Sequence, residues 1–138
     1  MAALPKSGDP VWRDEDINVL QVDISPSGNT IVTGDANGRV KIWTRISGTD
    51  NFETLIVDQA HVAGTGVRDV LLVDDGLFLT GGKDKRLKLW QITEDGIKLL
   101  DNHQFNGQVR SIAYEQQNRL VAVGAGKQLS LWKLNDRK

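Results

Sequence analysis

The chain has 138 residues, of which 39% are hydrophobic and 25% are charged, and its formal net charge at pH 7 is −1. This composition argues against a disordered or fibrous protein, and the near-neutral charge makes nucleic acid an unlikely partner. The chain has no cysteine, no apolar run long enough to cross a bilayer and no apolar core of a signal peptide near its start. We therefore expect an intracellular protein, cytoplasmic or nuclear, without disulfides, thiol catalysis or membrane contact.

The strands expected along the chain form a pattern that occurs three times. Each copy opens on a valine and ends on a tryptophan, at residues 19–43, 67–90 and 109–132. Within each copy, two turns rich in glycine, asparagine or aspartate separate three segments. The last segment of each copy alternates apolar and polar residues, which predicts a strand with one buried face, and the middle apolar run predicts a strand buried on both faces. Further strands are expected at 52–57 and 96–100, and no segment has a helical period.

The repeat predicts an all-β chain of three four-stranded antiparallel meanders, each of about 42 residues. The three units cover approximately residues 13–58, 59–101 and 102–134, within one domain of residues 10–134. Residues 1–9 are expected to form a flexible N-terminal tail and residues 135–138 a C-terminal tail. The chain stops just after the third strand of the third unit, so we expect that unit to lack its outer strand.

Several motifs are similar to those of the WD-repeat family of β-propellers. Residues 25–28 read Ser-Pro-Ser-Gly, a turn typical of the family, and Thr-Gly pairs close the second strand at 33–34 and 80–81. Asp84 lies six residues before Trp90, the family offset, and Asn37 takes that place before Trp43. The resemblance covers roughly residues 13–134. It implies propeller blades that would make half of a six-bladed ring or part of a larger one, and a scaffold for protein–protein contacts.

In this family a buried network of His, Ser or Thr, Asp and Trp locks each blade. The second unit carries all four residue types, whereas the first has Arg13 in place of the histidine, and the third has His103 with Ala122 and Gly126 at the partner positions. The blade-locking residues implied by the resemblance are His61, Thr80, Asp84, Trp90, Thr33, Asn37, Trp43 and Trp132. We expect the second unit to be the most rigid, then the first, then the third.

The resemblance also implies a binding face, built from the loops before each first strand and those between the second and third strands. Its candidate residues are Trp12, Arg13, Asp35, Asn37, His61, Arg68, Lys83, Lys85, His103, Arg110 and Lys127. Arg68 and Arg110 occupy equivalent places near the start of their units, and arginine and tryptophan often dominate interface energies. Equivalent arginines suit an acidic peptide or a phosphate-bearing ligand, although ordinary surface arginines would look the same.

No motif points to catalysis, a metal or a cofactor. His61 and His103 are the only histidines, and no HExxH motif accompanies them. The segment 124–127 resembles a phosphate loop but lacks its first glycine and the Ser or Thr after the lysine. We expect a non-enzymatic scaffold without metal or cofactor. The alternative is a ligand-binding propeller that recognises an anionic small molecule or a modified peptide.

Three units leave a propeller open, with apolar flanks and unpaired strand edges that favour association. Residues 10–12 lie where the outer strand of a preceding blade would be. We therefore expect the Val11–Trp12 segment of one copy to pair with the last blade of another, so that two copies close a six-bladed ring head to tail. Completion by a different chain, or by the rest of a longer protein, is the other possibility.

Overall fold

The computed structural model describes residues 10, 12–14 and 18–135. The regular structure of these residues consists of eleven β-strands, with no helix among them. The strands are β1 (Val19–Ile24), β2 (Thr30–Asp35), β3 (Val40–Arg45), β4 (Phe52–Val57), β5 (Val67–Asp74), β6 (Leu77–Gly82), β7 (Arg86–Thr93), β8 (Gly96–Gln104), β9 (Val109–Glu115), β10 (Leu120–Ala125) and β11 (Gln128–Lys133). Among these residues no helix is long and apolar enough to cross a membrane.

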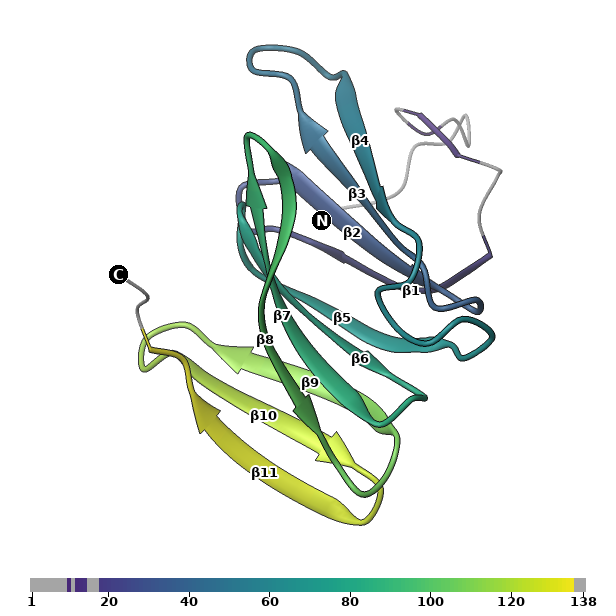
Figure 1. Ribbon diagram of the computed structural model, residues 1–138. Helices are drawn as coiled ribbons and strands as arrows, with labels where there is room; N and C mark the ends of the chain where they lie inside the picture. The colour runs from purple at the N-terminus through teal and green to yellow at the C-terminus, as the bar shows by residue number, and fades with distance from the viewer. Residues whose placement is uncertain (1–9, 11, 15–17, 136–138) are drawn as a thin grey trace.

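The strands form three antiparallel sheets in which each strand pairs with its neighbours in the chain. The first sheet contains β1 to β4, the second β5 to β8 and the third β9 to β11. The sheets lie one after another, with the second between the other two (Figure 1). The expected all-β blades are confirmed, and the third blade has three strands within the described residues. We refer to the sheets as blades 1, 2 and 3.

Burial is greatest in the second strands of blades 1 and 2. Five of the six residues of β2, and likewise of β6, are buried, which matches the apolar runs expected for strands covered on both faces. The outer strand β4 is mostly exposed. The turn between β2 and β3 requires Gly38, because its φ is +85° and a Cβ there would lie 2.7 Å from the carbonyl oxygen of His61.

Two apolar cores hold the blades together. Between blades 1 and 2, Val32, Val40 and Ile42 pack with Phe78 and Trp90 of the second blade. Between blades 2 and 3, a second cluster joins residues of β6 and β7 to residues of β9 and β10. The core of this protein therefore lies between the sheets, and each blade is stable only against a neighbour.

Both cores contain the same close contact between a glycine and a valine. A Cβ placed on Gly34 of β2 would lie 2.4 Å from Cγ1 of Val67 on the next blade, and one on Gly81 of β6 would lie 2.4 Å from Cγ1 of Val109. Each glycine therefore forms a notch that the valine of the next blade fills. Thr33-Gly34 and Thr80-Gly81 close their strands with glycine because no side chain fits there.

Aspartates of the inner strands also bridge neighbouring blades. Oδ2 of Asp23 accepts a hydrogen bond from the backbone N–H of Leu72 at 2.7 Å, and Oδ2 of Asp69 accepts one from that of Ile112 at 2.6 Å. Burial raises the pKa of Asp69, and its hydrogen bonds from backbone N–H groups act in the opposite direction. These bonds fix the position of each blade's first strand relative to the first strand of the next blade.

Candidate functional site

The most highly organised polar cluster of the chain lies inside blade 2. Trp90 Nε1 donates to Thr80 Oγ1 at 2.9 Å, and Thr80 Oγ1 lies 2.7 Å from His61 Nε2. On the other side of the ring, His61 Nδ1 lies 2.8 Å from Asp84 Oδ1. The carboxylate must accept from Nδ1, so Nε2 accepts from the threonine hydroxyl, and every polar atom in the chain of bonds has a partner. We call these four residues the blade 2 network.

Burial has the largest influence on both ionisable groups of the blade 2 network. It lowers the pKa of His61 below the ordinary 6.5, and the nearby Asp84 carboxylate opposes this only in part. Burial alone would raise the pKa of Asp84, but hydrogen bonds from His61 and from the backbone N–H groups of Val62 and Arg86 together hold it below the ordinary 3.8. At pH 7 the network therefore contains a neutral imidazole and a carboxylate.

Blade 1 uses different contacts at the corresponding places. Asp35, expected on the binding face, is buried, and its Oδ1 accepts from the backbone N–H groups of Asn37 and Arg39 at 2.8 and 3.0 Å. Asn37 thus donates to the turn through its backbone. Thr33 and Trp43 are both buried, and no hydrogen bond joins their side chains to any residue that the structure describes.

Trp12 and Asp14 also contact blade 1. Trp12 stacks on Trp43 with ring centroids 5.9 Å apart and lies against Phe52 at 5.6 Å. Asp14 pairs with Lys41. The Trp12 indole therefore packs on its own blade, and the expected pairing of the Val11–Trp12 segment with the last blade of another copy stays a prediction. Val11 lies outside the described residues.

Blade 3 lacks the network, and the expected equivalences need correction. His103 belongs to β8 of blade 2, where it pairs with Leu87. Its expected place is taken by Phe105, whose N–H donates to the carbonyl of Lys85 at 2.8 Å, much as the N–H of His61 donates to that of Gly38 at 3.0 Å. No motif of the sequence predicts this role of Phe105, because a phenylalanine before a strand does not belong to the expected pattern.

The strand register also corrects the partner positions of blade 3. Val123, and not Ala122, corresponds to Thr80, because Val123 pairs with Ser130 as Thr80 pairs with Lys88. The turn from β10 to β11 is one residue shorter than the turn from β6 to β7, so Gly126 does not correspond to Asp84. The Trp132 indole N–H instead donates to Ser130 Oγ at 2.7 Å, close to the protein surface.

The loops of the expected binding face do lie together at one end of the blades. The N–H of Lys83 donates to the carbonyl of Gly66 at 2.9 Å, and that of Gly126 donates to the carbonyl of Gln108 at 3.0 Å. In blades 2 and 3, the loop before the first strand therefore touches the turn between the second and third strands. Asp35 and His61 were expected on this surface, but both are buried and are not part of it. The exposed or half-buried members at this end are Asn37, Arg68, Lys83, Lys85, Arg110 and Lys127, whereas the exposed Arg13 precedes β1.

Arg68 and Arg110 sit at equivalent irregularities of the inner strands. The pairing register shifts between Val67 and Asp69 and again around Arg110, so each arginine is the extra residue of its strand. Such bulges re-aim a side chain and occur often beside binding sites. Leu20 holds this place in blade 1. Neither arginine side chain makes a hydrogen bond or ion pair with another described residue.

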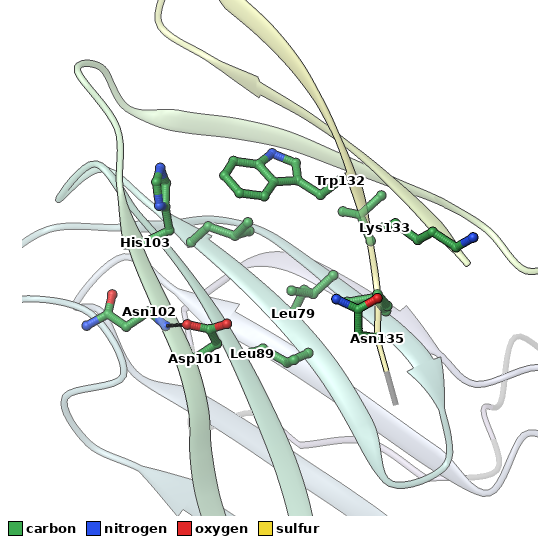
Figure 2. A pocket seen from close by; sticks show the side chains of 11 residues that line it. Leu79, Leu89, Asp101, Asn102, His103, Trp132, Lys133 and Asn135 are labelled. Atoms are coloured by element: carbon green, nitrogen blue, oxygen red, sulfur yellow. Dashed lines mark hydrogen bonds between the residues drawn. The ribbon is translucent and has the colours of Figure 1, made fainter. Parts of the chain in front are cut away.

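A pocket of about 390 Å³ opens between blades 2 and 3, near the outer strands. His103 and Trp132 lie edge to face at its mouth with centroids 4.8 Å apart, above Leu79 and Leu89 (Figure 2). Asp101, Asn102 and Lys133 add polar groups at its rim. Between blades 1 and 2, Ile97 of β8 and Ile92 of β7 pack against the core. The pocket lies beside β11, the last described strand of blade 3. In blade 2 the fourth strand, β8, packs at the corresponding place.

The described residues contain no group of three or more His, Asp or Glu side chains placed to hold a metal ion. The blade 2 network is enclosed, and its histidine has no route to a substrate because the ring is fully buried. The arrangement is suited to holding strands together, and the exposed loops at one end are suited to binding.

Comparison with known proteins identifies the repeat. The family model "WD domain, G-beta repeat" matches residues 12–44 and 52–91. The chain is 34% identical to human WD repeat and SOCS box-containing protein 1 over 110 residues, which cover 76% of this chain and 24% of that protein. It is 29% identical to mouse Echinoderm microtubule-associated protein-like 1 over 114 residues, 82% of this chain and 13% of that protein.

A third relative is the putative E3 ubiquitin-protein ligase LIN-1 of Lotus japonicus, 23% identical over 124 residues, which cover 83% of this chain and 8% of that protein. The aligned part of the chain thus spans a quarter or less of the length of these relatives. The family model covers more than half of the chain, across blades 1 and 2, and the fold repeats the same meander in blade 3. The chain belongs to the WD-repeat family.

Proposed function

We propose that this chain is a non-catalytic WD-repeat scaffold that binds other proteins and requires another chain to complete its propeller. The main support for the proposal is the difference between the buried and the exposed polar groups of the chain. The buried ones bond to one another, as in the blade 2 network, while the loop end presents arginines and lysines without partners among the described residues. Buried polar groups with partners stabilise a fold, and unpartnered exposed ones are free for recognition.

The binding surface we propose is the loop end of blades 2 and 3. Arg68 and Arg110 lie there in equivalent strand bulges, and Lys83, Lys85 and Lys127 lie in the neighbouring turns. Guanidinium groups pair with carboxylates through two parallel hydrogen bonds, so an acidic segment of a partner protein matches this surface. The net charge of −1 for the whole chain makes this a local attraction, which increases the association rate most at low salt.

The relatives support an interaction role. One is named for a SOCS box beside its WD repeats, one for association with microtubules and one as a putative ubiquitin ligase. These names share no reaction, which is expected where the repeat supplies binding and other parts supply the remaining activity. An intracellular location is the setting we propose.

Charge reversal at the two bulged arginines tests the proposed surface. Proteins captured from a cell extract by the immobilised chain are compared with those captured by the Arg68→Glu, Arg110→Glu double variant and by a Lys98→Glu control on β8. We expect the double variant to lose a defined set of acidic proteins that the control retains. An unchanged set, with the variant folded by circular dichroism, would place binding elsewhere.

The second candidate is a ligand-binding propeller, which the two unpartnered arginines favour if the ligand is a small anion. Titration with inorganic phosphate, followed by chemical shifts of the arginine side chains, separates the two functions. Saturable shifts at Arg68 and Arg110 that the double variant lacks would favour the small ligand, whereas unchanged shifts would favour the protein partner.

A further inference from the structure

The two internal blade interfaces share one design. The downstream face of a blade supplies a glycine notch on its second strand and two apolar residues on its third strand, Val40 and Ile42 in blade 1. The upstream face of the next blade supplies apolar residues of its first strand, Val67 and Val70 in blade 2. Val67 fills the notch of Gly34, and Val109 fills that of Gly81 in the same way.

Blade 3 carries an unoccupied downstream face of the same kind. Gly124 pairs with Leu129 as Gly34 pairs with Val40, and Ala122 pairs with Leu131 as Val32 pairs with Ile42. Leu129 and Leu131 are 79% and 67% exposed, whereas Val40 and Ile42 are fully buried. A Cβ on Gly124 would meet nothing nearer than Ser111, at 3.9 Å. The notch is present, and among the described residues no valine fills it.

Blade 1 carries the matching upstream face. Val22 pairs with Thr33 as Val70 pairs with Thr80, and Val19 opens its strand as Val67 does. Val19, Val22 and Ile24 are 46%, 62% and 55% exposed, while their counterparts Val67, Val70 and Leu72 are almost completely buried. The chain therefore has the two halves of its own repeated contact, one at each end.

We propose that a second copy of this chain covers these faces, with Val19 of each copy in the Gly124 notch of the other. The inference rests on the proposed completion of the propeller and names the partner and the contact that complete it. A second copy is the occupant that the structure favours, because it offers a valine-led strand to the glycine notch in the geometry already present twice within the chain.

The contact is head to tail, so it uses two different surfaces, and two copies related by a twofold axis make it twice and close a ring. The new interface differs from the internal ones in one respect. Asp23 and Asp69 bridge the internal interfaces, but blade 3 has Ala113 and Ser111 at these two places. Without a bridging carboxylate the junction between copies is weaker than those within a copy, so the assembly dissociates on dilution.

The test uses two variants that each block one face. Gly124→Val fills the notch, and Val19→Asp places a charge on the opposite end. Gly124 does not have a positive φ, and its surroundings are open, so blade 3 itself accommodates the valine. By sedimentation velocity at tens of micromolar, we expect the natural chain at twice its 15.2 kDa mass and each variant at the single-chain mass. Overpacking of this contact should raise the dissociation constant by about tenfold or more.

Mixing the two variants tests directly whether the contact is head to tail. Val19→Asp retains a free notch and Gly124→Val retains a free valine, so an equimolar mixture should recover a dimer held by one junction. Glu53→Val, which adds a valine on β4 away from both faces, should remain dimeric. Circular dichroism checks each fold, and Gly124→Ala with Val19→Ser serves as the milder pair if either variant unfolds.

Three results would overturn the inference. A natural chain that stays monomeric would exclude the second copy, while leaving binding at the Arg68 and Arg110 surface to its own test. Dimers that persist in Gly124→Val would show that association does not use the notch. A mixture of the folded variants that remains monomeric would exclude the head-to-tail contact.

Discussion

Replacing Thr80 with valine should destabilise the chain by more than its small change in volume suggests. The Thr80 hydroxyl accepts from the Trp90 indole at 2.9 Å and bonds to His61 Nε2 at 2.7 Å, and all three side chains are buried. Valine leaves the indole N–H and the imidazole nitrogen without partners. A buried polar group left unsatisfied costs about 1–3 kcal/mol, so two such groups predict a loss of about 2–6 kcal/mol.

Urea unfolding followed by far-ultraviolet circular dichroism measures this loss, with all proteins at one concentration because association adds to apparent stability. Thr54→Val is the matched control, since Thr54 is exposed on β4, and its free energy of unfolding should change by less than about 0.5 kcal/mol. A Thr80→Val variant that unfolds at the same urea concentration as the control would refute the assigned role of the blade 2 network.

Four further predictions follow from the same contacts. Burial lowers the pKa of His61, so below pH 6.5 the unfolded chain binds a proton that the folded chain does not bind. The melting temperature should therefore fall from pH 7.5 to 5.5, and His61→Gln should reduce this dependence on pH. The same dependence in both proteins would contradict the neutral imidazole. Gly81→Ala should lose about 1–3 kcal/mol in the same urea assay, because its Cβ meets Val109, and an unchanged midpoint would mean that the blades separate freely. Ser130→Ala should lose less than about 1 kcal/mol, because the bond to Trp132 is exposed to water, whereas a loss as large as that of Thr80→Val would give blade 3 a network of its own. Amide exchange should be slowest in blade 2, then blade 1, then blade 3, and slowest exchange in blade 3 would reverse the ranking.

The repeat made most of the fold predictable, because strand periodicity and glycine-rich turns are local properties of the sequence. The alternation around Trp43, Trp90 and Trp132 located the third strand of each blade, and the observed strands follow it. The four residue types of the blade 2 network were also visible at their spacing. The structure adds the partners and the direction of each hydrogen bond, which depend on how separate loops meet.

The remaining site residues depended on contacts that spacing does not encode. Phe105 occupies the place expected of His103 because β8 runs as far as Gln104 before its loop begins. The loop position of Asp35 predicts a residue of the binding face, but Asp35 is buried and its carboxylate accepts hydrogen bonds from the backbone N–H groups of Asn37 and Arg39. The ring topology predicts that the Val11–Trp12 segment pairs with another copy, whereas spacing alone does not predict the stacking of Trp12 on Trp43.

The first and third blades expose apolar side chains on the faces that point away from blade 2. Val19, Val22 and Leu129 are exposed at positions whose counterparts in blade 2 are buried, and Leu131 is exposed where Leu89 is half-buried. Exposed apolar surface of this extent favours association in water. These faces are the surfaces that the proposed contact between two copies would cover.

The most direct measurement is the mass of the natural chain by sedimentation equilibrium across the micromolar range. We expect a reversible rise from 15.2 kDa toward twice that mass as concentration increases, with no larger species. A mass that stays at that of one chain up to hundreds of micromolar, with the blades folded, would contradict it.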